Sequence, residues 1–211
     1  MDIPAEAEAY AKADFAGVNQ AFADRLLELV GPLEEAAAVD LGTGPADIPI
    51  RVVQARPLWH VAAVDASRAM LELARQAVEE ARLSDRIELV LADAKSTSLP
   101  TGAFDVVFSN SILHHINEVE QFWTELRRLA RAGAVVLLRD LARPARPEAA
   151  RQIVNEYAAQ ESGLLQEEFY RSLLASYTPD EIRAQLDLAG LTALKVAMVS
   201  DRHFDVFGRL P

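Results

Sequence analysis

The chain has 211 residues, of which 51% are hydrophobic and 25% are charged, a composition typical of globular proteins that excludes a disordered or fibrous chain. Its 21 Lys and Arg against 32 Asp and Glu give a formal net charge of -11, and because such a surface repels a phosphate backbone we expect no nucleic-acid partner. The sequence contains no cysteine, which excludes disulfides and thiolate metal sites.

The N-terminal part of the chain predicts a helix and no targeting signal. It starts with the acidic stretch MDIPAEAEAY, and no apolar run reaches the roughly 18 residues that span a bilayer, so we expect a cytoplasmic protein without a membrane partner. Apolar side chains then recur at helical spacing, namely Phe15, Val18, Phe22, Leu26 and Leu29. Gly31 and Pro32 end this pattern, and we expect residues 1–34 to contribute N-terminal cap helices.

From Ala36 onward, short apolar runs alternate with longer helical patterns. Five runs are nearly continuously apolar, as expected for parallel strands covered by helices on both faces: AAAVDL, HVAAVD, RIELVLAD, FDVVFSN and AVVLLRD. Ser67–Leu83 and Glu118–Arg131 carry apolar residues at helical spacing, and Gly133 follows the second pattern as a stop. This rhythm predicts an α/β fold with a doubly wound, mostly parallel sheet, and residues 1–211 as one domain.

The segment after the fifth run departs from this rhythm. LARPARPE is a proline-punctuated connector, and helical patterns follow at about Ala149–Gln160 and Leu165–Ser176. We therefore expect a helical insertion over residues 141–177, which is placed to act as a lid.

The C-terminal part predicts one more helix and two strands. In TPDE, Thr178 is suited to cap a helix and Glu181 completes a capping box. The last strand-like runs are Thr192–Val199 and Arg202–Gly208, which we expect to form an antiparallel pair at the edge of the sheet.

The loop VDLGTGPADIPI follows the first predicted strand and precedes a helix, where ligands bind in open α/β sheets. Gly42 and Gly44 allow a ligand to approach the backbone, although a tight turn without a ligand would use them as well. A P-loop is excluded because Gly-Lys-Ser/Thr is missing. A dinucleotide fingerprint would place its third glycine at Asp47, whose carboxylate would repel a diphosphate. The loop therefore favours a cationic ligand without phosphate, such as S-adenosylmethionine.

Three further predicted strands end in residues that suit the same ligand. Asp65 is placed to accept hydrogen bonds from both ribose hydroxyls, although it could instead cap the following helix, alone or with Ser67. Asp93 is placed to accept from an adenine amino group while the Ala94 amide donates to the ring, although Asp93 alone is equally typical of a turn. Asn110 would face the methionine end or the methyl group.

The stretches VDLGTGPAD, VDAS, LADA and FDVVFSNSILHHI, in this order, resemble the class I (Rossmann-like) S-adenosylmethionine-dependent methyltransferases of the small-molecule type. The resemblance implies seven strands with the last one antiparallel. It implies that the methionine portion of the cofactor contacts Asp40, Gly42, Thr43 and Gly44, the ribose Asp65, and the adenine Asp93 and Ala94. We also assign Ala66 and Met70 to the cofactor site. Where the family often has a third glycine, this chain has Ala46, for which we expect altered affinity rather than loss of binding.

Residues for the chemistry follow the fourth predicted strand. Methyl transfer to an acceptor is a displacement in which positioning supplies much of the rate, so a strong base is not always needed. His114 and His115 are the acid–base candidates because imidazole titrates near neutral pH, although packing or helix capping would also explain them. We expect no metal, since adjacent histidines rarely converge on one ion and no third ligand is suitably spaced.

Four residues are candidates for contact with a small-molecule acceptor: Tyr10, Phe15, Arg139 and Tyr170. Arg139 and the adjacent Asp140 end the fifth run, where an internal ion pair is an equal alternative to substrate binding. The aromatic residues would line the lid, or simply the core.

Methyl transfer from S-adenosylmethionine is the predicted function. A non-catalytic protein that binds S-adenosylmethionine as a sensor or assembly factor stays open, and an NAD(P)-dependent oxidoreductase is disfavoured by Asp47.

Overall fold

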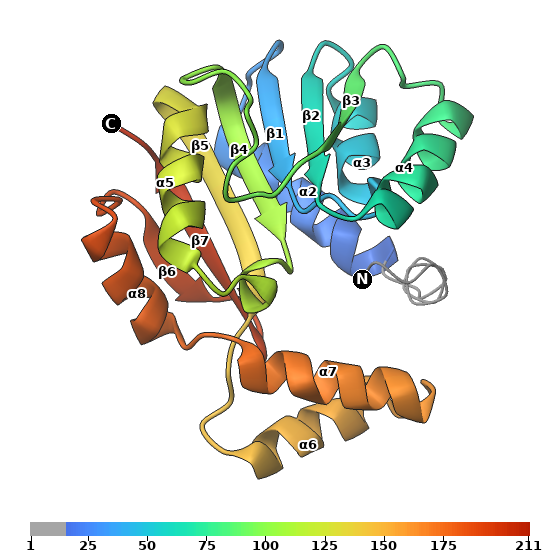
Figure 1. Ribbon diagram of the computed structural model, residues 1–211, viewed down its shortest axis with the longest axis vertical. Coiled ribbons are helices and arrows are strands. Elements are labelled where there is room, and N and C mark those ends of the chain that lie inside the picture. The colour runs from blue at the N-terminus through green and yellow to red at the C-terminus, as the bar shows by residue number, and fades with distance from the viewer. Residues whose placement is uncertain (1–15) are drawn as a thin grey trace.

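The computed structural model describes residues 16–211, which form a seven-stranded sheet with helices on both faces (Figure 1). The strand order is β3-β2-β1-β4-β5-β7-β6. The strands are β1 (Ala37–Leu41), β2 (His60–Asp65), β3 (Ile87–Leu91), β4 (Phe104–Asn110), β5 (Ala130–Leu141), β6 (Lys195–Met198) and β7 (His203–Arg209). The first five are parallel, whereas β7 is antiparallel to both β5 and β6. The predicted doubly wound sheet with an antiparallel last strand is confirmed.

Two hydrophobic layers cover the two faces of this sheet. One face packs against α2 (Ala16–Val30), α3 (Asp47–Ala55) and α4 (Arg68–Glu80), with the fully buried Phe22 in this layer. The other face packs against α5 (Val119–Leu129) and α8 (Pro179–Leu188), with the fully buried Trp123 in this layer. Because both faces are covered, the central strands are continuously apolar and only their ends carry polar side chains.

The end of α5 differs from the prediction. The helix ends at Leu129, and Gly133, which the sequence suggested as its stop, lies inside β5. Ala130 already pairs with Phe104 of β4, and Arg131 forms an ion pair with Asp105 of the same strand at 2.7 Å. The chain therefore passes from helix to strand without a loop, because contacts with β4 hold it in an extended conformation from Ala130 onward.

The segment between β5 and α8 forms two helices, α6 (Pro147–Tyr157) and α7 (Gly163–Ala175). Figure 1 shows both beyond the carboxyl end of β5, away from the helices that cover the sheet. They share a small apolar cluster with Leu141 of β5, which includes Val154 and Leu173. Helix α7 also contacts the short 3₁₀ helix η1 (Leu113–His115) that follows β4. Within residues 16–211 we find no helix that is both long enough and apolar enough to cross a membrane.

Candidate functional site

The glycine loop after β1 is bound to the end of β2. The backbone N–H groups of Gly42 and Thr43 both donate to the carbonyl of Val64, each at 2.8 Å. Gly42 has a φ of 80°, and a Cβ at this position would lie 2.5 Å from the Cδ1 atom of Ile112. Both the left-handed backbone and the contact with Ile112 therefore require glycine, so the loop has a fixed shape before any ligand binds.

Ala46 occupies the position at which a third glycine was expected. It has a φ of 63° and a ψ of 23°, immediately before α3, and its side chain is fully buried. A left-handed conformation costs a residue with a Cβ about 1–2 kcal/mol. The chain therefore keeps the glycine-type backbone here at the cost of local strain.

Asp65, at the end of β2, connects two loops through its carboxylate. Oδ2 accepts a hydrogen bond from the Gly44 amide and Oδ1 accepts one from the Ser67 amide, both at 2.8 Å. The cap of α4 is Ser67, whose hydroxyl accepts from the Met70 amide, so Asp65 is not itself the N-cap. Each carboxylate oxygen has a second lone pair and keeps the capacity to accept from a ligand hydroxyl.

Asp40 and Thr43 place a buried carboxyl group and an unpaired hydroxyl group at this loop. Burial raises the pKa of the Asp40 carboxyl to about 7; the nearby Thr43 hydroxyl opposes the shift and the charge of Asp65 adds to it. The geometry nevertheless completes no hydrogen bond for Thr43 Oγ1, which is buried and has no partner within residues 16–211. A buried carboxyl group beside a second carboxylate and an unpaired hydroxyl fit a ligand that carries positive charge and hydrogen-bonding groups.

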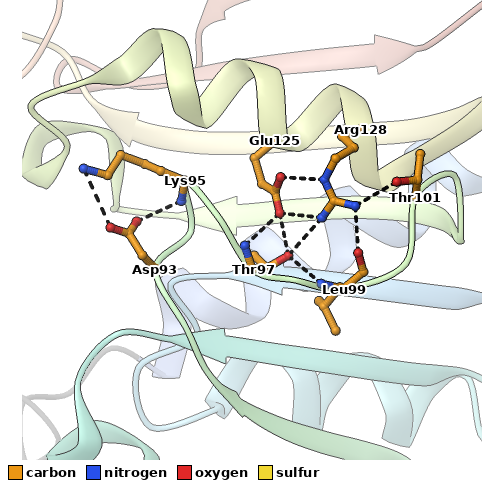
Figure 2. A network of polar contacts seen from close by, with 7 residues as sticks. All are labelled: Asp93, Lys95, Thr97, Leu99, Thr101, Glu125 and Arg128. Atoms are coloured by element: carbon orange, nitrogen blue, oxygen red, sulfur yellow. Dashed lines mark hydrogen bonds and ion pairs between the residues drawn. The ribbon is translucent and has the colours of Figure 1, made fainter.

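The loop after β3 carries Asp93 and Ala94 (Figure 2). Asp93 Oδ1 accepts from the Lys95 amide at 2.8 Å, which is the geometry of an Asx turn. The Lys95 ammonium lies 3.7 Å from Asp93 Oδ2 and 3.2 Å from Glu118 Oε2. The Asp93 side chain remains exposed, so its role in the turn leaves acceptor capacity for a ligand.

A buried polar network that the sequence analysis missed holds the same loop against α5 (Figure 2). Glu125 accepts from both the amide and the hydroxyl of Thr97, at 2.8 and 2.6 Å, and from Arg128 at 2.7 Å. Arg128 also donates to the carbonyl of Leu99 at 2.7 Å. The Arg128 guanidinium holds the pKa of Glu125 at about 2. A Glu and an Arg three residues apart on a helix usually form a surface pair, so the sequence carries no signal for this network.

The two histidines of η1 differ in their surroundings. His114 is almost completely buried, and its Nδ1 atom lies 2.6 Å from Oδ1 of the buried Asp140, at the end of β5. His115 stacks on His114 with ring centroids 4.0 Å apart and keeps an exposed edge. Partial desolvation, together with the neighbouring His114, lowers the pKa of His115 to about 4.

Of the four candidates for the acceptor site, the two within the described residues, Arg139 on β5 and Tyr170 on α7, have separate partners. Arg139 makes a bidentate ion pair with the buried Asp205, at 2.7 and 2.9 Å, and lies over the ring of Phe22. Tyr170, on α7, packs under the Arg151 guanidinium. Tyr10 and Phe15 lie outside the described residues.

The sheet brings most of the predicted cofactor residues to one edge. Because β3, β2, β1 and β4 are neighbours and run in parallel, their carboxyl ends place the loops of Asp93, Asp65, Gly42 and Asn110 in a row. Asp40 lies within β1 below its loop, and Ala66 is exposed whereas Met70 is buried at the start of α4. Among the described residues, no group of three or more His, Asp or Glu is arranged to hold a metal ion.

Comparisons with known proteins find methyltransferases that are similar to part of this chain. Residues 39–138 match the family described as "Methyltransferase domain". The release factor glutamine methyltransferase of Rhodopirellula baltica is 33% identical over 98 residues, which are 46% of this chain and 33% of that protein. The ubiquinone/menaquinone biosynthesis C-methyltransferase of Cereibacter sphaeroides (strain ATCC 17029 / ATH 2.4.9) is 23% identical over 122 residues, which are 58% of this chain and 49% of that protein. The chain thus spans from a third to about half of these relatives.

Solved structures extend the likeness to the whole fold. A SAM-dependent methyltransferase from Aquifex aeolicus superimposes with a TM-score of 0.72 and covers 99% of both chains at 20% identity. At this identity the likeness establishes the fold alone. It includes β6, β7 and the helices of the insertion, which lie outside the family match at residues 39–138.

Proposed function

We propose that the protein methylates a small-molecule acceptor, because residues 39–138 match the methyltransferase-domain family and the chain has the fold of a solved SAM-dependent methyltransferase. One observation carries the proposal furthest. The preshaped Gly42–Gly44 loop covers a buried carboxyl group at Asp40 and an unpaired hydroxyl at Thr43, with the carboxylate of Asp65 beside them. This set of groups suits a ligand with ammonium, sulfonium and hydroxyl groups and no phosphate.

The proposed roles follow the order of the strand ends. Asp65, already bound to two backbone amides, would use its remaining lone pairs to hold the ribose hydroxyls. Asp40 and the Gly42–Gly44 loop would hold the methionine portion, with Asn110 near the methyl group. The loop of Asp93 and Ala94 would hold the adenine, with Ala66 and Met70 flanking the nucleoside. S-adenosylmethionine supplies a methyl carbon that its sulfonium has activated, so the chain's main contribution is to position the acceptor in line with it.

Asp47 favours the methyltransferase over the alternative of an NAD-dependent oxidoreductase. It lies in the first turn of α3, where a dinucleotide fingerprint has its third glycine, and it accepts from Asn19 at 2.9 Å and from Arg51 at 2.8 Å. A carboxylate fixed at this helix N-terminus opposes a pyrophosphate. A non-catalytic S-adenosylmethionine-binding protein would share all of these residues, and turnover on acceptors separates the two. The cytoplasmic location and the absence of a nucleic-acid partner stay predictions.

Calorimetric titration with S-adenosylmethionine, S-adenosylhomocysteine and NAD tests the cofactor assignment. We expect micromolar binding of the first two and none of NAD. The change of Asp65 to Ala should weaken binding tenfold or more, because a charge-assisted hydrogen bond contributes about 1.5–3 kcal/mol. Asp85→Ala is the matched control, since Asp85 is an exposed carboxylate after α4, and it should bind as the wild type does. Binding of NAD, or equal binding by Asp65→Ala, would contradict the proposal.

A further inference from the structure

The contact between His114 and Asp140 joins two elements that meet at the carboxyl edge of the sheet. His114 belongs to η1 after β4, and Asp140 lies near the end of the neighbouring strand β5. Their side chains are 5% and 2% exposed, and the Nδ1 to Oδ1 distance is 2.6 Å. The same 3₁₀ segment follows Ile112, whose side chain covers Gly42 of the glycine loop. The pair therefore lies beside the proposed cofactor loop.

The backbone determines which ring nitrogen of His114 carries the proton. Asp140 Oδ2 accepts from the Leu113 amide at 2.6 Å, and Oδ1 accepts from the Leu141 amide at 2.7 Å. Both oxygens of Asp140 therefore already act as acceptors toward the backbone. His114 Nδ1 must then be the donor in the contact with Oδ1. In the neutral ring Nε2 is the basic nitrogen, and no residue within 16–211 forms a hydrogen bond with it.

The other titratable groups around the pair leave this arrangement intact. Burial lowers the pKa of His203, at the start of β7, to about 4, so this ring is neutral near pH 7 although Asp140 opposes the shift. His115 is neutral for a similar reason. The Tyr177 hydroxyl donates to the Ile116 carbonyl, and burial raises its pKa, with Asp140 among the smaller causes. The charged residues of α7, which packs on η1, pair elsewhere: Glu167 with Arg151, and Arg171 with Glu167 and Glu168.

We propose that Asp140 is a positioning residue that fixes His114 in the Nδ1–H tautomer, so that His114 Nε2 serves as the base for an acceptor whose methylated atom carries a proton. This inference rests on the proposed function. In the step, the new bond to the methyl carbon forms from a lone pair of an O–H or N–H acceptor, or from the electron pair that an acidic C–H bond leaves on carbon when its proton is removed. The carbon–sulfur bond breaks at the same time and its electron pair stays on the sulfur. The acceptor's proton passes to Nε2, which gives a neutral methylated product and an imidazolium stabilised by Asp140. The substrate class is therefore protic, with an O–H, N–H or acidic C–H group.

The tautomer is measurable without any acceptor. We would label the full chain with ¹⁵N-histidine and record the imidazole signals at pH 7.5, alone and with S-adenosylhomocysteine, assigning His114 by its substitution. We expect a protonated Nδ1 and an unprotonated Nε2 in the wild type. In Asp140→Asn the carboxamide can donate to Nδ1, so the signals should shift toward the Nε2–H tautomer. A wild-type ring with its proton on Nε2 would overturn the proposal.

Measurements of turnover distinguish whether His114 acts as a base or only anchors η1. In His114→Asn the amide nitrogen can keep the hydrogen bond to Asp140 while the base is lost, so this variant should fold and bind S-adenosylhomocysteine within about threefold of the wild type. With phenol, acetylacetone and benzylamine as acceptor probes, we expect its kcat to fall at least about 100-fold with little change in KM for S-adenosylmethionine. His60→Asn, at the opposite end of β2, is the control.

Two results would overturn the inference in different ways. If His114→Asn keeps kcat within about threefold of the wild type, His114 is an anchor for η1 and the base assignment is wrong while the proposed function stands. If the wild type binds no S-adenosylmethionine and methylates none of the probes, the proposed function fails and this inference fails with it.

Discussion

At the scale of single residues, Asp40 links cofactor binding to pH. Its pKa is raised to about 7, against about 3.9 for an unperturbed Asp, chiefly because the carboxyl group is buried. Between these two values the folded chain binds more protons than the unfolded chain. The free energy of unfolding therefore falls as pH rises from about 4 to about 7, and this contribution is constant above that range.

A cationic ligand should bind more tightly as pH rises, because its positive charge favours the ionised form of Asp40. We expect the affinity for S-adenosylmethionine to rise roughly fivefold from pH 6 to pH 7 and binding at pH 7 to release about half a proton. Calorimetry in buffers with different ionisation enthalpies measures the released proton. Asp40→Asn should abolish the release, and an unchanged release in this variant would show that another group is responsible.

Ala46 provides a second test at this scale, this time of backbone strain. Replacement by glycine stabilises the folded chain by about 1–2 kcal/mol, because it removes the left-handed strain. It also destabilises the folded chain in two ways: the lost burial of a methyl group costs about 0.8 kcal/mol, and the greater conformational entropy of the unfolded chain costs about 0.5–1 kcal/mol. We therefore expect Ala46→Gly to change the free energy of unfolding by less than about 1 kcal/mol. Ala46→Val should cost about 2–4 kcal/mol, since a β-branched residue disfavours a φ of 63° and the added methyl groups would enter a fully buried site. Urea denaturation of both variants measures this, and equal stabilities would contradict it.

At the scale of elements, the network of Glu125, Arg128 and Thr97 fixes the loop after β3 to α5. Glu125→Gln keeps the shape of the side chain but removes the charge that pairs with Arg128. We expect it to lower the free energy of unfolding by about 2–3 kcal/mol, below the range for a fully buried pair because Arg128 is partly exposed. S-adenosylhomocysteine should also bind severalfold more weakly, because the same loop carries Asp93 and Ala94. Urea denaturation and calorimetry measure the two effects, with the exposed Glu120→Gln on the same helix as control.

Acid titration distinguishes the charge of Glu125 from its shape. Its folded pKa of about 2 lies below the unfolded value of about 4.5, so its contribution is complete above pH 4.5 and is lost as pH falls toward 2. The stability difference between the wild type and Glu125→Gln should therefore narrow from pH 5 to pH 3. A difference that stays constant over this range would mean that the variant acts through packing alone.

The helices and their contacts show which features could be predicted from the sequence and which could not. The capping box of Thr178 and Glu181 was predicted and is confirmed, because its parts lie three residues apart and the pattern is local. The end of α5 was predicted wrongly because it depends on pairing with β4, and the contact of Arg131 with Asp105 is invisible to helical periodicity. The contact of His114 with Asp140 joins residues 26 positions apart, so neither histidine could be distinguished from the other before the strands were placed.

At the scale of the whole molecule, the doubly wound, mostly parallel sheet was predictable from the sequence, whereas the placement of the insertion was not. Parallel strands with crossover helices allow few arrangements, so alternating runs from Ala36 onward indicate the sheet. No comparable rule determines where the helices α6 and α7 lie. The position of α6 depends on contacts with distant segments, such as the stacking of Arg202, just before β7, on Tyr157 at 3.3 Å. The ion pair of Arg143 with Glu181 joins the loop before α6 to α8. The lid role of residues 141–177 stays a prediction.

The proposed cofactor site spans loops from β1, β2, β3 and β4, so a bound ligand should stabilise the whole sheet rather than one loop. A ligand that binds only the folded chain, at 100 times its Kd, adds about 2.7 kcal/mol to the free energy of unfolding. For a chain of this size each kcal/mol raises Tm by about 2–4 °C, so saturating S-adenosylhomocysteine should raise Tm by about 5–11 °C. Differential scanning calorimetry measures this, with NAD at the same concentration as the control that leaves Tm unchanged. Because this stabilisation depends on the ratio of ligand concentration to Kd, a tenfold weaker Asp65→Ala should lose about 1.3 kcal/mol of it at the same ligand concentration. A shift that Asp65→Ala retains in full would place the ligand away from the loops of β1 and β2.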